Sequence, residues 1–439
     1  MPLIEPRVLK GFRDFLPSQE LARRRMVGII EDSFRSFGFV PIDTPALEYA
    51  EILLGKGGGE TEKQVYRFTD QGGRDVALRF DLTVPFARFT AEHRGELVMP
   101  FRRYHIAKVW RGENTQRGRY REFTQCDFDI LGESGPAADF EILLMMKRTL
   151  TELLAPKGAA SGNGGGDAKP PGITIRVNHR GLFNRFLSSL GLADRSVEIL
   201  RQVDKLAKAG RDAVGKALEA AAGTEKSGRI LDFVSLGGGG FDETLESLRS
   251  AAGDGEDIRR LLAIRRFMKD AGETEGFVLD PSVTRGLDYY TGVVYESFLD
   301  ALPGIGSVCS GGRYDNLTGL YAKEGVCGVG ASIGLDRLQA ALEELGAAAA
   351  PPAAAAALAC PDEADAGRAH KTAALFRRRG LSCEVFYGAD KITRFFMLAE
   401  KKGIPWVIIP DKNAGAGPGE NKSAGAGESG EGGGDARFT

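Results

Sequence analysis

Four stretches rich in glycine, or in alanine and proline, interrupt the apolar patterning of this chain. They lie at residues 161–167, 237–240, 346–357 and 414–435. Glycine makes up 59 of the 439 residues, which is well above its ordinary share of about 7%. Because such stretches supply no large side chains to a core, we interpret them as linkers. A chain of this length fits about three domains. The sequence therefore predicts several folded segments followed by a disordered tail.

The tail also contains GAGESG at residues 425–430, a literal match to the GxGxxG dinucleotide pattern. No apolar strand precedes it and no helical pattern follows, so we exclude a dinucleotide site there. The sequence has no GxxxxGK[ST] either. A nucleotide site in this chain would have to be neither a P-loop nor a Rossmann crevice.

The first part of the chain combines one helical pattern with several strand patterns. Residues 18–37 repeat apolar side chains at helical spacing, with Ser18 placed to cap the helix and Gly38 to end it. Residues 121–131 (REFTQCDFDIL) alternate and are rich in aromatic residues, which is typical of an antiparallel strand with one polar face. Further strands are predicted at 39–45, 76–80 and 105–110. These patterns predict an α+β fold built on an antiparallel sheet.

Helical patterns then predominate, and the chain closes on a strand–helix alternation. Helices are predicted at 196–209, 211–222 and 258–271, which indicates a mainly helical insertion. After the alanine and proline stretch, strands at 356–360, 383–387 and 406–409 alternate with helices at 364–379 and 391–402. This order is typical of a small α/β domain.

Composition excludes several classes of protein. The 58 basic and 60 acidic residues give a formal charge of -2, which leaves room only for a local basic patch, and 42% hydrophobic residues exclude wholesale disorder. The apolar runs are too short to span a bilayer, so we expect a cytoplasmic protein. Five cysteines without a CxxC pair and four histidines without ligand spacing support neither a zinc site nor a disulfide framework.

Three blocks concentrate arginine, carboxylate and tyrosine beside glycine: residues 111–132, 285–296 and 328–337. Arginine forks suit phosphate oxygens, and glycines on a strand-to-helix passage let a backbone approach a ligand. Each block also has a structural interpretation. The first could be a solvated hairpin of alternating charge, the second a strand pair with a turn at Gly292, and the third tight strand packing before a capped helix.

Together the blocks resemble the histidyl-tRNA synthetases, a family of class II aminoacyl-tRNA synthetases. RGENTQRGRYREF at 111–123 is similar to class II motif 2, and GVGASIGLDR at 328–337 to motif 3. RGLDYYTG at 285–292 and GSVCSGGRYDNL at 306–317 are similar to the two signatures particular to the histidyl family. KGFRDFLP at 10–17 and RFDLTVPFAR at 79–88 resemble further family segments, so the resemblance covers about residues 7–410. QCDFDI at 125–130 resembles the eukaryotic-type branch.

The resemblance implies an ATP site. Histidine and ATP would form histidyl-adenylate and pyrophosphate, and the protein would supply position and charge rather than a covalent nucleophile. Arg285 and Arg111 would be catalytic, with Arg285 near the α-phosphate. ATP would enter with Mg²⁺ bridging phosphate oxygens, and no protein ligand to the metal is identified. The implied ATP-binding residues are Arg111 on the α-phosphate, Glu113 and Phe123 at adenine, and Arg119 and Arg337 on the outer phosphates.

The resemblance also implies a histidine pocket and a contact with tRNA. An imidazole needs partners for both ring nitrogens and the ammonium needs oxygens. The implied residues are Asp81, Thr83 and Gln125 at the amino and carboxylate end, with Asp129, Tyr289 and Tyr290 around the ring. Taken without the surrounding signature, the two tyrosines would be interpreted as core residues. Gln116 and Arg117 match positions that touch the acceptor end of the tRNA.

The resemblance further implies domains and an assembly. We expect a catalytic core at 1–172 and 276–345, a helical insertion at 173–275, a linker at 346–355, an anticodon-binding-like domain at 356–411 and the tail at 412–439. Because the tail has almost no apolar side chains, we expect this last domain to lack an edge strand and its covering helix and to bind tRNA weakly and with strong salt dependence. The helix–strand passage at 21–45 is the counterpart of the dimerising motif 1, so we expect a homodimer.

Two non-catalytic relatives remain as alternatives to the enzyme. One is the regulatory subunit of ATP phosphoribosyltransferase, which keeps the core fold but erodes the signatures. The other is a module that senses uncharged tRNA. Arg111, Arg119, Arg285 and Arg337 are all present, which favours the enzyme.

Overall fold

The computed structural model describes residues 3–55, 62–155, 172–284, 290–315, 318–322, 325–348, 350–388 and 391–410. The chain divides into two units, Met1–Ala350 and Pro351–Thr439. Each unit has its own apolar core.

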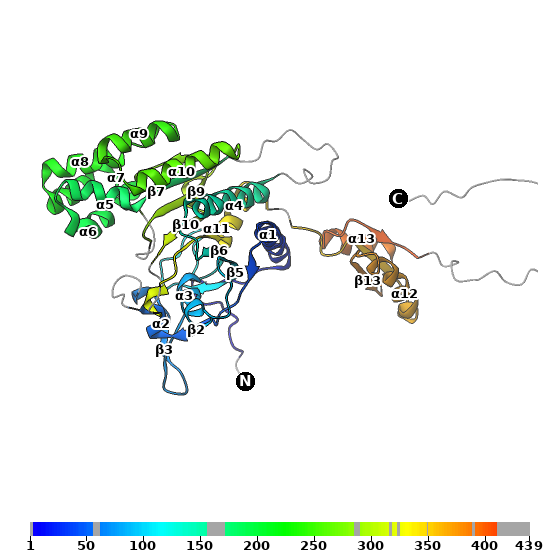
Figure 1. Ribbon diagram of the computed structural model, residues 1–439. Coiled ribbons are helices and arrows are strands. Elements are labelled where there is room, and N and C mark those ends of the chain that lie inside the picture. The colour runs from blue at the N-terminus through cyan, green and yellow to red at the C-terminus, as the bar shows by residue number, and fades with distance from the viewer. Residues whose placement is uncertain are drawn as a thin grey trace, which may run out of the picture. The chain divides into compact units, whose positions relative to one another are not determined.

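An eight-stranded sheet forms the centre of the first unit (Figure 1), in the order β1-β5-β6-β11-β10-β9-β7-β8. Pairing is antiparallel except at the two edges, where β1 runs parallel to β5 and β7 runs parallel to β8. The strands are β1 (Val40–Pro41), β5 (Phe101–Trp110), β6 (Glu122–Leu131), β7 (Ile173–His179), β8 (Phe277–Leu279), β9 (Val293–Leu299), β10 (Cys309–Tyr314) and β11 (Gly328–Gly334). The predicted antiparallel-sheet fold class is confirmed.

One face of this sheet is apolar and packs against helices. Phe128 of β6 lies against Phe34 of α1, with ring centroids 4.7 Å apart, and Tyr104 of β5 lies on the same side. Both belong to the main core, together with side chains of the other helices that cover this face. These helices are α1 (Pro17–Ser36), α4 (Pro136–Leu154) and α11 (Leu335–Glu344).

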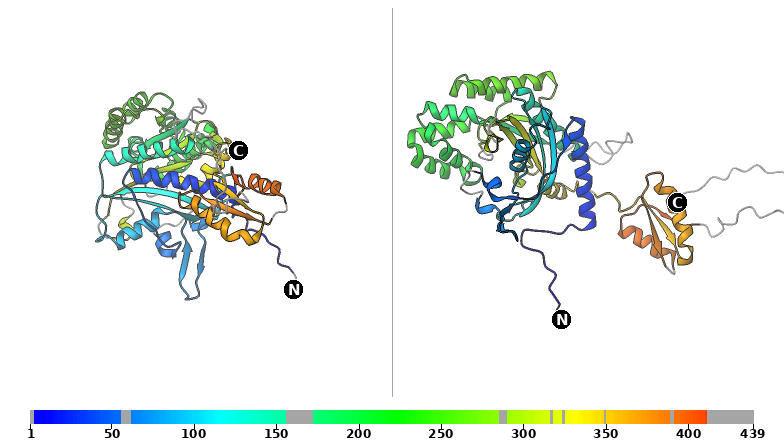
Figure 2. Two further views of the ribbon diagram at one scale, coloured as in Figure 1. Left: turned by 90° about the vertical axis from the view of Figure 1, so that its right-hand side faces the viewer. Right: turned by 60° about the horizontal axis from the view of Figure 1, so that its bottom comes forward.

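The opposite face is covered by a smaller layer (Figure 2). Phe86 of α3 lies under the guanidinium of Arg103, 3.9 Å from ring centroid to Cζ, and near Phe101. Arg103 is the cross-strand neighbour of Asp129 and therefore points away from the Phe128 side. The layer contains α2 (Ala50–Leu54), α3 (Thr83–Glu92) and the antiparallel sheet β2-β4-β3, formed by Leu47–Tyr49, Asp75–Leu78 and Arg67–Thr69.

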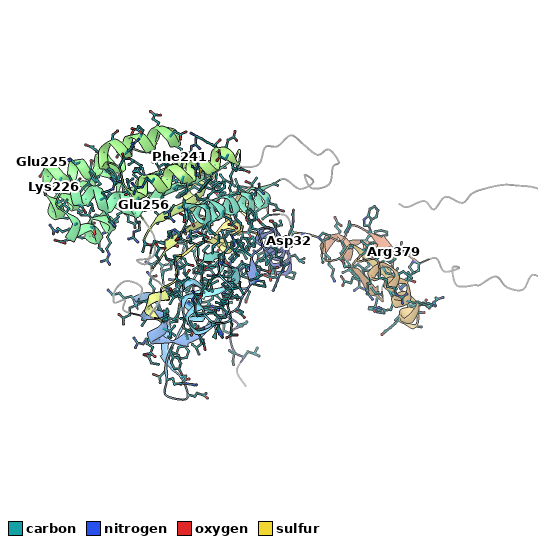
Figure 3. The ribbon with its side chains drawn as sticks, in the orientation of Figure 1. Asp32, Glu225, Lys226, Phe241, Glu256 and Arg379 are labelled. Atoms are coloured by element: carbon teal, nitrogen blue, oxygen red, sulfur yellow. The ribbon has the colours of Figure 1, made fainter. Side chains whose placement is uncertain are left out.

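Six helices connect β7 to β8. Their apolar sides form a core in which Phe186 and Phe233 stack with centroids 4.0 Å apart, while Glu225 and Glu256 lie on the outer surface (Figure 3). These helices are α5 (Arg180–Ser189), α6 (Ser196–Val203), α7 (Leu206–Ala222), α8 (Thr224–Val234), α9 (Phe241–Ala252) and α10 (Glu256–Asp270). Among the helices of the described ranges, none has the length and apolar character needed to cross a membrane.

A buried carboxylate joins these helices to the sheet. Asp139 of α4 is fully buried and accepts hydrogen bonds from Arg260 Nε of α10 at 2.6 Å and from Arg313 Nε of β10 at 2.8 Å. The carbonyl of Arg313 accepts from the backbone N–H of Thr291 at 2.8 Å. Asp139 therefore ties the helical segment, α4 and the strand beside residues 290–292 into one unit.

The second unit is a three-layered α/β fold built on the parallel sheet β13-β12-β14. Phe386 and Phe395 lie in its core. Its strands are β12 (Ala356–Cys360), β13 (Cys383–Tyr387) and β14 (Val407–Ile408), and its helices are α12 (Ala366–Arg377) and α13 (Ile392–Lys401). The predicted order of elements is confirmed. The predicted loss of an edge strand and the predicted disorder concern the tail, which lies outside the described residues.

Several predicted boundaries were wrong. Ser18 does not cap α1, because the helix begins one residue earlier with Pro17 in its first turn and Leu16 before it. The strand expected at 39–45 is reduced to Val40–Pro41. The helix expected at 196–209 ends at Val203, and a second helix begins at Leu206. Periodicity alone did not reveal this interruption because apolar spacing continues across it. The break at Gly210 (φ 80°) agrees with the predicted boundary between residues 209 and 211.

One strand lies within the range expected for the helical insertion. β7, at residues 173–179, lies within the expected range but pairs with β9 in the large sheet. The helices themselves begin at Arg180.

Candidate active site

The face of the sheet under α3 carries a row of polar side chains from β6. Gln125, Asp127 and Asp129 alternate with the apolar Cys126 and Phe128, so they share one face, and all three are buried. Asp129 lies opposite Arg103 on one side and Gly330 of β11 on the other. A Cβ at Gly330 would lie 2.0 Å from Asp129 Oδ1. The glycine of the third block is thus required for the aspartate to occupy this place.

A cavity of about 130 Å³ opens at the end of this face, beside the start of α11. Phe123 and Arg111 form one wall, and the Arg111 guanidinium carbon lies 5.2 Å from the ring centroid of Phe123. Arg111 Nε donates to the carbonyl of Phe80 at 2.8 Å, which fixes the side chain. An aromatic face beside a fixed guanidinium suits a planar base attached to a phosphate.

Arg337, in the first turn of α11, forms the opposite wall of the cavity. Burial, the nearby Arg119 and then Arg111 lower its pKa to about 10, and Glu113 partly offsets this. Arg119 Nε is buried and makes no hydrogen bond to the described protein atoms. Three arginines thus lie close enough here for Arg119 and Arg111 to repel the charge of Arg337. Such a place suits a polyanion such as a triphosphate.

Further along the same face of the sheet lies a cluster of buried carboxylates. Asp129 Oδ1 accepts from the Tyr314 hydroxyl at 2.6 Å, and its Oδ2 lies 2.7 Å from Nη2 of the fully buried Arg103. Asp81 Oδ1 accepts from the backbone N–H of Val84 at 3.1 Å, while Asp81 Oδ2 is buried without a partner in the described part of the chain. The cluster therefore contains more buried carboxyl groups than buried arginines and suits a cationic ligand.

Burial is the main cause of the pKa shifts in this cluster. It raises the pKa of Asp81 to about 6, against the pull of the Val84 amide, Arg111 and Arg103. It raises the pKa of Asp127 to about 7, with Arg103 opposing and Asp129 reinforcing the shift. The pKa of Asp129 is also raised by burial, although Arg103 and the Tyr314 hydroxyl favour its charged form. Several buried carboxyls with raised pKa values close to one another are typical of a functional site.

The other predicted residues fall around the cavity and the carboxylate cluster. Gln125 Nε2 donates to Ser332 Oγ at 2.8 Å, and its Oε1 is buried without a partner among the described atoms. Thr83 is half-buried at the start of α3, and half-buried Tyr290 packs against the cluster that contains Phe86 and Tyr314. Gln116 pairs with Arg119 across the motif 2 loop, and exposed Arg117 forms an ion pair with Glu344 at 2.8 Å.

Two predicted residues, Arg285 and Tyr289, lie outside the described residues. Conversely, three residues at the carboxylate cluster were missed: Arg103, Asp127 and Tyr314. Asp127 shares the alternation of Gln125 and Asp129, so the pattern could have identified it. Arg103 precedes the range predicted for its strand, and the pairing that brings it opposite Asp129 leaves no local signal in the sequence.

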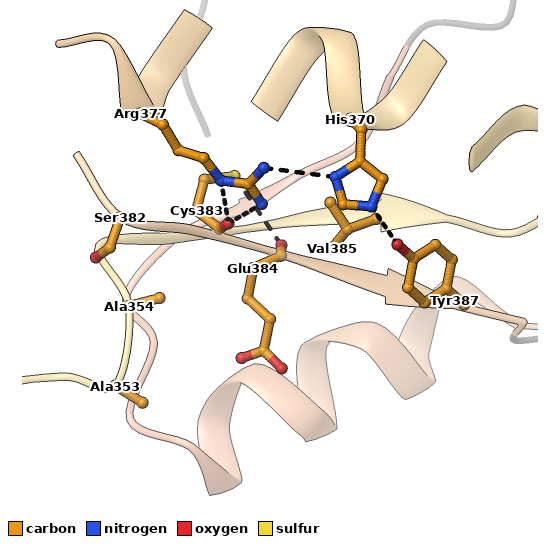
Figure 4. A pocket seen from close by; sticks show the side chains of 9 residues that line it. All are labelled: Ala353, Ala354, His370, Arg377, Ser382, Cys383, Glu384, Val385 and Tyr387. Carbon is orange, nitrogen blue, oxygen red and sulfur yellow. Dashed lines mark hydrogen bonds between the residues drawn. The ribbon is translucent and has the colours of Figure 1, made fainter. Parts of the chain in front are cut away.

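A larger cavity, of about 380 Å³, lies in the second unit (Figure 4). His370 Nε2 and the Tyr387 hydroxyl are 2.5 Å apart, and Arg377 Nη2 donates to the carbonyl of Cys383 at 2.7 Å. Arg377 Nη1 also lies 3.4 Å from His370 Nδ1, so His370, Arg377 and Tyr387 are linked to one another within the lining. The carboxylates and convergent arginines described above have no counterpart among the residues that line it.

The chain is similar to known proteins over nearly its whole length. The family profile described as Histidyl-tRNA synthetase matches residues 11–338. A histidine–tRNA ligase of Treponema denticola is 52% identical over 420 residues, covering 94% of this chain and 90% of its own. One from Rhodopirellula baltica is 44% identical, covering 94% and 91%. The crystal structure of histidyl-tRNA synthetase from Nostoc sp. PCC 7120 superimposes with a TM-score of 0.80 at 29% identity, covering 94% of this chain and 93% of that one.

Proposed function

Because the chain belongs to the histidyl-tRNA synthetase family, we propose that the cavity beside Phe123 binds ATP and the adjoining carboxylate cluster binds histidine for one reaction. The chain is an ATP-dependent histidine–tRNA ligase. We assign ATP to one place and histidine to the other because the two places carry opposite charges. Arginines converge beside Phe123, and buried carboxylates lie further along the same face of the sheet.

The reaction requires positioning and charge. A carboxylate oxygen of histidine forms a bond to the α-phosphorus of ATP as the bond to pyrophosphate breaks, which gives histidyl-adenylate. A hydroxyl of the terminal tRNA nucleotide then attacks the carbonyl carbon and AMP leaves. Arg111 would neutralise the charge that develops on the α-phosphate, Arg119 and Arg337 would hold the outer phosphates, and Glu113 and Phe123 would hold adenine.

We propose that Mg²⁺ arrives with the nucleotide. Among the described residues, no three histidine, cysteine or acidic side chains are grouped to hold a metal ion, and the side chains that converge at the phosphate end are arginines. These residues do not fit a metal held by the protein. Charge neutralisation at the phosphates is therefore assigned to Arg111, Arg119 and Arg337.

Arg285 is our first choice as the catalytic residue, and this proposal rests on the family signature at 285–292 alone. Tyr289 is assigned to the imidazole on the same ground. Thr83, Gln125 and Asp81 would hold the ammonium and carboxylate of histidine. Asp129 and Tyr290 would face its ring.

Replacing Asp129 with asparagine should weaken histidine binding about 10- to 100-fold, because a charge-assisted acceptor is lost from the imidazole side. ATP affinity should change less than twofold, since the phosphate end keeps its arginines. Titration calorimetry with each substrate separately measures both effects. An unchanged histidine affinity would mean that Asp129 only supports Arg103 and Tyr314.

The raised pKa values of Asp81 and Asp127 predict a pH dependence. As pH rises from 5.5 to 8, both carboxyls lose protons, so attraction for the histidine ammonium grows and the KM for histidine should fall. In Asp81→Asn the fall should be smaller, whereas the KM for ATP should follow the same profile in both proteins. A histidine profile identical in variant and wild type would remove Asp81 from the histidine site.

Stability should change with pH in the opposite direction. The folded state holds these two protons more tightly than the unfolded chain, whose aspartates have a pKa of 3.8. This contribution to stability is complete below pH 3.8 and is lost as pH rises through about 6 and about 7. Ionisation of Asp81 and Asp127 should therefore strengthen the binding of histidine while it lowers the stability of the folded protein without ligand.

Histidine-dependent exchange of pyrophosphate into ATP is the experiment that tests the proposed function. A regulatory subunit or a sensor of uncharged tRNA would bind ligands without exchange. Both alternatives are less supported, because the curated relatives of high coverage are histidine–tRNA ligases. If the wild-type protein showed no pyrophosphate exchange, the two non-catalytic alternatives would be better supported than the enzyme.

The remaining assignments are proposals drawn from the resemblance. Gln116 and Arg117 would contact the acceptor end of the tRNA, and the exposed loop position of Arg117 supports this. The second unit, with its linker before β12, would bind the anticodon, and α5–α10 would form the helical insertion. The enzyme would act as a cytoplasmic homodimer that pairs through the region of α1 and β1.

A further inference from the structure

Residues 9–16 form a short segment, here called the N-terminal strap, that leads into α1. The backbone carbonyl of Gly11 accepts from the N–H of Arg121 at 2.8 Å. Gly11 has φ +90°, and a Cβ there would lie 2.7 Å from the Arg121 side chain and 2.9 Å from Thr115. The strap therefore lies directly against the motif 2 loop, and only glycine fits this approach.

Arg13 of the strap makes the most specific contacts. Its Nη1 donates to the Tyr120 hydroxyl at 3.1 Å, and its guanidinium carbon lies 4.0 Å from the Tyr120 ring centroid and 4.3 Å from that of Phe15. Its Nη2 donates to Asp336 Oδ1 at 2.7 Å. One planar cation thus connects the motif 2 loop to the first turn of α11.

Asp336 is buried and collects donors from three parts of the chain. Besides Arg13, its Oδ2 accepts from Arg23 Nη2 of α1 at 3.1 Å and from the backbone N–H of Thr124 at 2.7 Å. Thr124 follows Phe123 and Asp336 precedes Arg337, and Phe123, Asp336 and Arg337 all line the nucleotide cavity. Gly118 of the loop also packs on Arg337, because a Cβ there would lie 3.3 Å from the Arg337 backbone.

We propose that Arg13, acting through Asp336 and Tyr120, is a positioning residue for ATP: it holds the motif 2 loop and Arg337 at the spacing that the nucleotide requires. This proposal rests on the proposed function of the cavity. Arg13 has no place in the cavity lining itself. Its effect must pass through the loop and the first turn of α11.

The test compares Arg13→Ala with Arg13→Lys and with Arg7→Ala. Lysine keeps a positive charge near Asp336 but cannot stack flat on Tyr120 or contact both partners. Arg7 lies in the same N-terminal region with its side chain 81% exposed, 4.0 Å from Glu5. Steady-state pyrophosphate exchange gives the KM for ATP, the KM for histidine and kcat of each protein, and thermal unfolding gives Tm.

For Arg13→Ala we expect the KM for ATP to rise about tenfold, the effect of losing one charge-assisted hydrogen bond, with the KM for histidine within twofold of wild type. The KM for ATP of Arg13→Lys should lie between those of wild type and Arg13→Ala, and that of Arg7→Ala should equal the wild-type value. An unchanged KM for ATP, or equal rises in both KM values together with a lower Tm, would overturn the proposal.

Calorimetric titration of ATP into wild type, Arg7→Ala and Arg13→Ala separates this proposal from the proposed function. If wild type exchanges no pyrophosphate, the function fails while the titration still tests the strap. In that case a weaker ATP affinity in Arg13→Ala supports the positioning role. An equal affinity in the three proteins refutes it.

Discussion

Replacing Arg111 with alanine should slow histidyl-adenylate formation by about 10²- to 10³-fold, the usual loss when one preorganised donor is removed from a developing charge. Arg111 is fixed by the Phe80 carbonyl and by Phe123, so its guanidinium needs no rearrangement at the moment of reaction. Rapid-quench measurement of a single turnover reports this step directly. The affinity for histidine should stay within threefold, because the carboxylate cluster keeps its residues.

Arg102→Ala is the matched control. Arg102 lies on β5 next to Arg103 but pairs with Glu141 of α4 at 2.9 Å, on the opposite face of the sheet. Its removal should leave the single-turnover rate within twofold of wild type. If Arg111→Ala formed adenylate as fast as Arg102→Ala, the phosphate site would lie elsewhere.

Asp139→Ala should lower the free energy of unfolding by about 3–5 kcal/mol, the cost of removing one partner from a buried ion pair. The substitution removes the carboxylate that Arg260 and Arg313 share, so that Arg313, which is almost wholly buried, keeps among the described carboxylates only its longer contact with Asp315 at 3.4 Å. Urea unfolding followed by circular dichroism measures the change. Because the Arg313 carbonyl holds the N–H of Thr291, the KM for histidine should rise under conditions where the variant is still folded.

Asp242→Ala tests whether this cost comes from burial. Asp242 also contacts two cations, Arg265 at 3.0 Å and Lys269 at 3.1 Å, but its side chain is 53% exposed. Exposed pairs of this kind contribute about 0–1 kcal/mol, so the control should unfold near the wild-type midpoint. Equal losses from the two substitutions would show that Asp139 acts as an ordinary surface pair.

Local patterns were sufficient to predict the elements that carry the site. The alternation of 121–131 predicted β6 and its polar face, and the glycines of 328–337 predicted the strand-to-helix passage that delivers Arg337. Each of these signals is complete within about ten residues. The strands and helices of the second unit were predicted for the same reason.

Contacts between distant segments could not be predicted in this way. Arg103 meets Asp129 through strand pairing, Arg13 meets Asp336 across 323 residues, and Asp139 bridges α10 and β10. In each case the partner of a buried charge is determined by the packing of whole elements, which no local spacing encodes. The exact ends of helices were missed because apolar periodicity runs through short breaks.

The pairing of β6 has a consequence for how chains of this kind can vary in length. Residues 123, 125, 127 and 129 lie on the face proposed to bind the substrates, whereas Cys126, Phe128 and Ile130 lie in the core under α1 and α4. Insertion or deletion of a single residue in β6 would turn Phe128 toward the proposed substrate site and Asp129 into the hydrophobic core. Such a change should abolish both catalysis and folding. During evolution β6 should therefore change by replacement, without gain or loss of a residue.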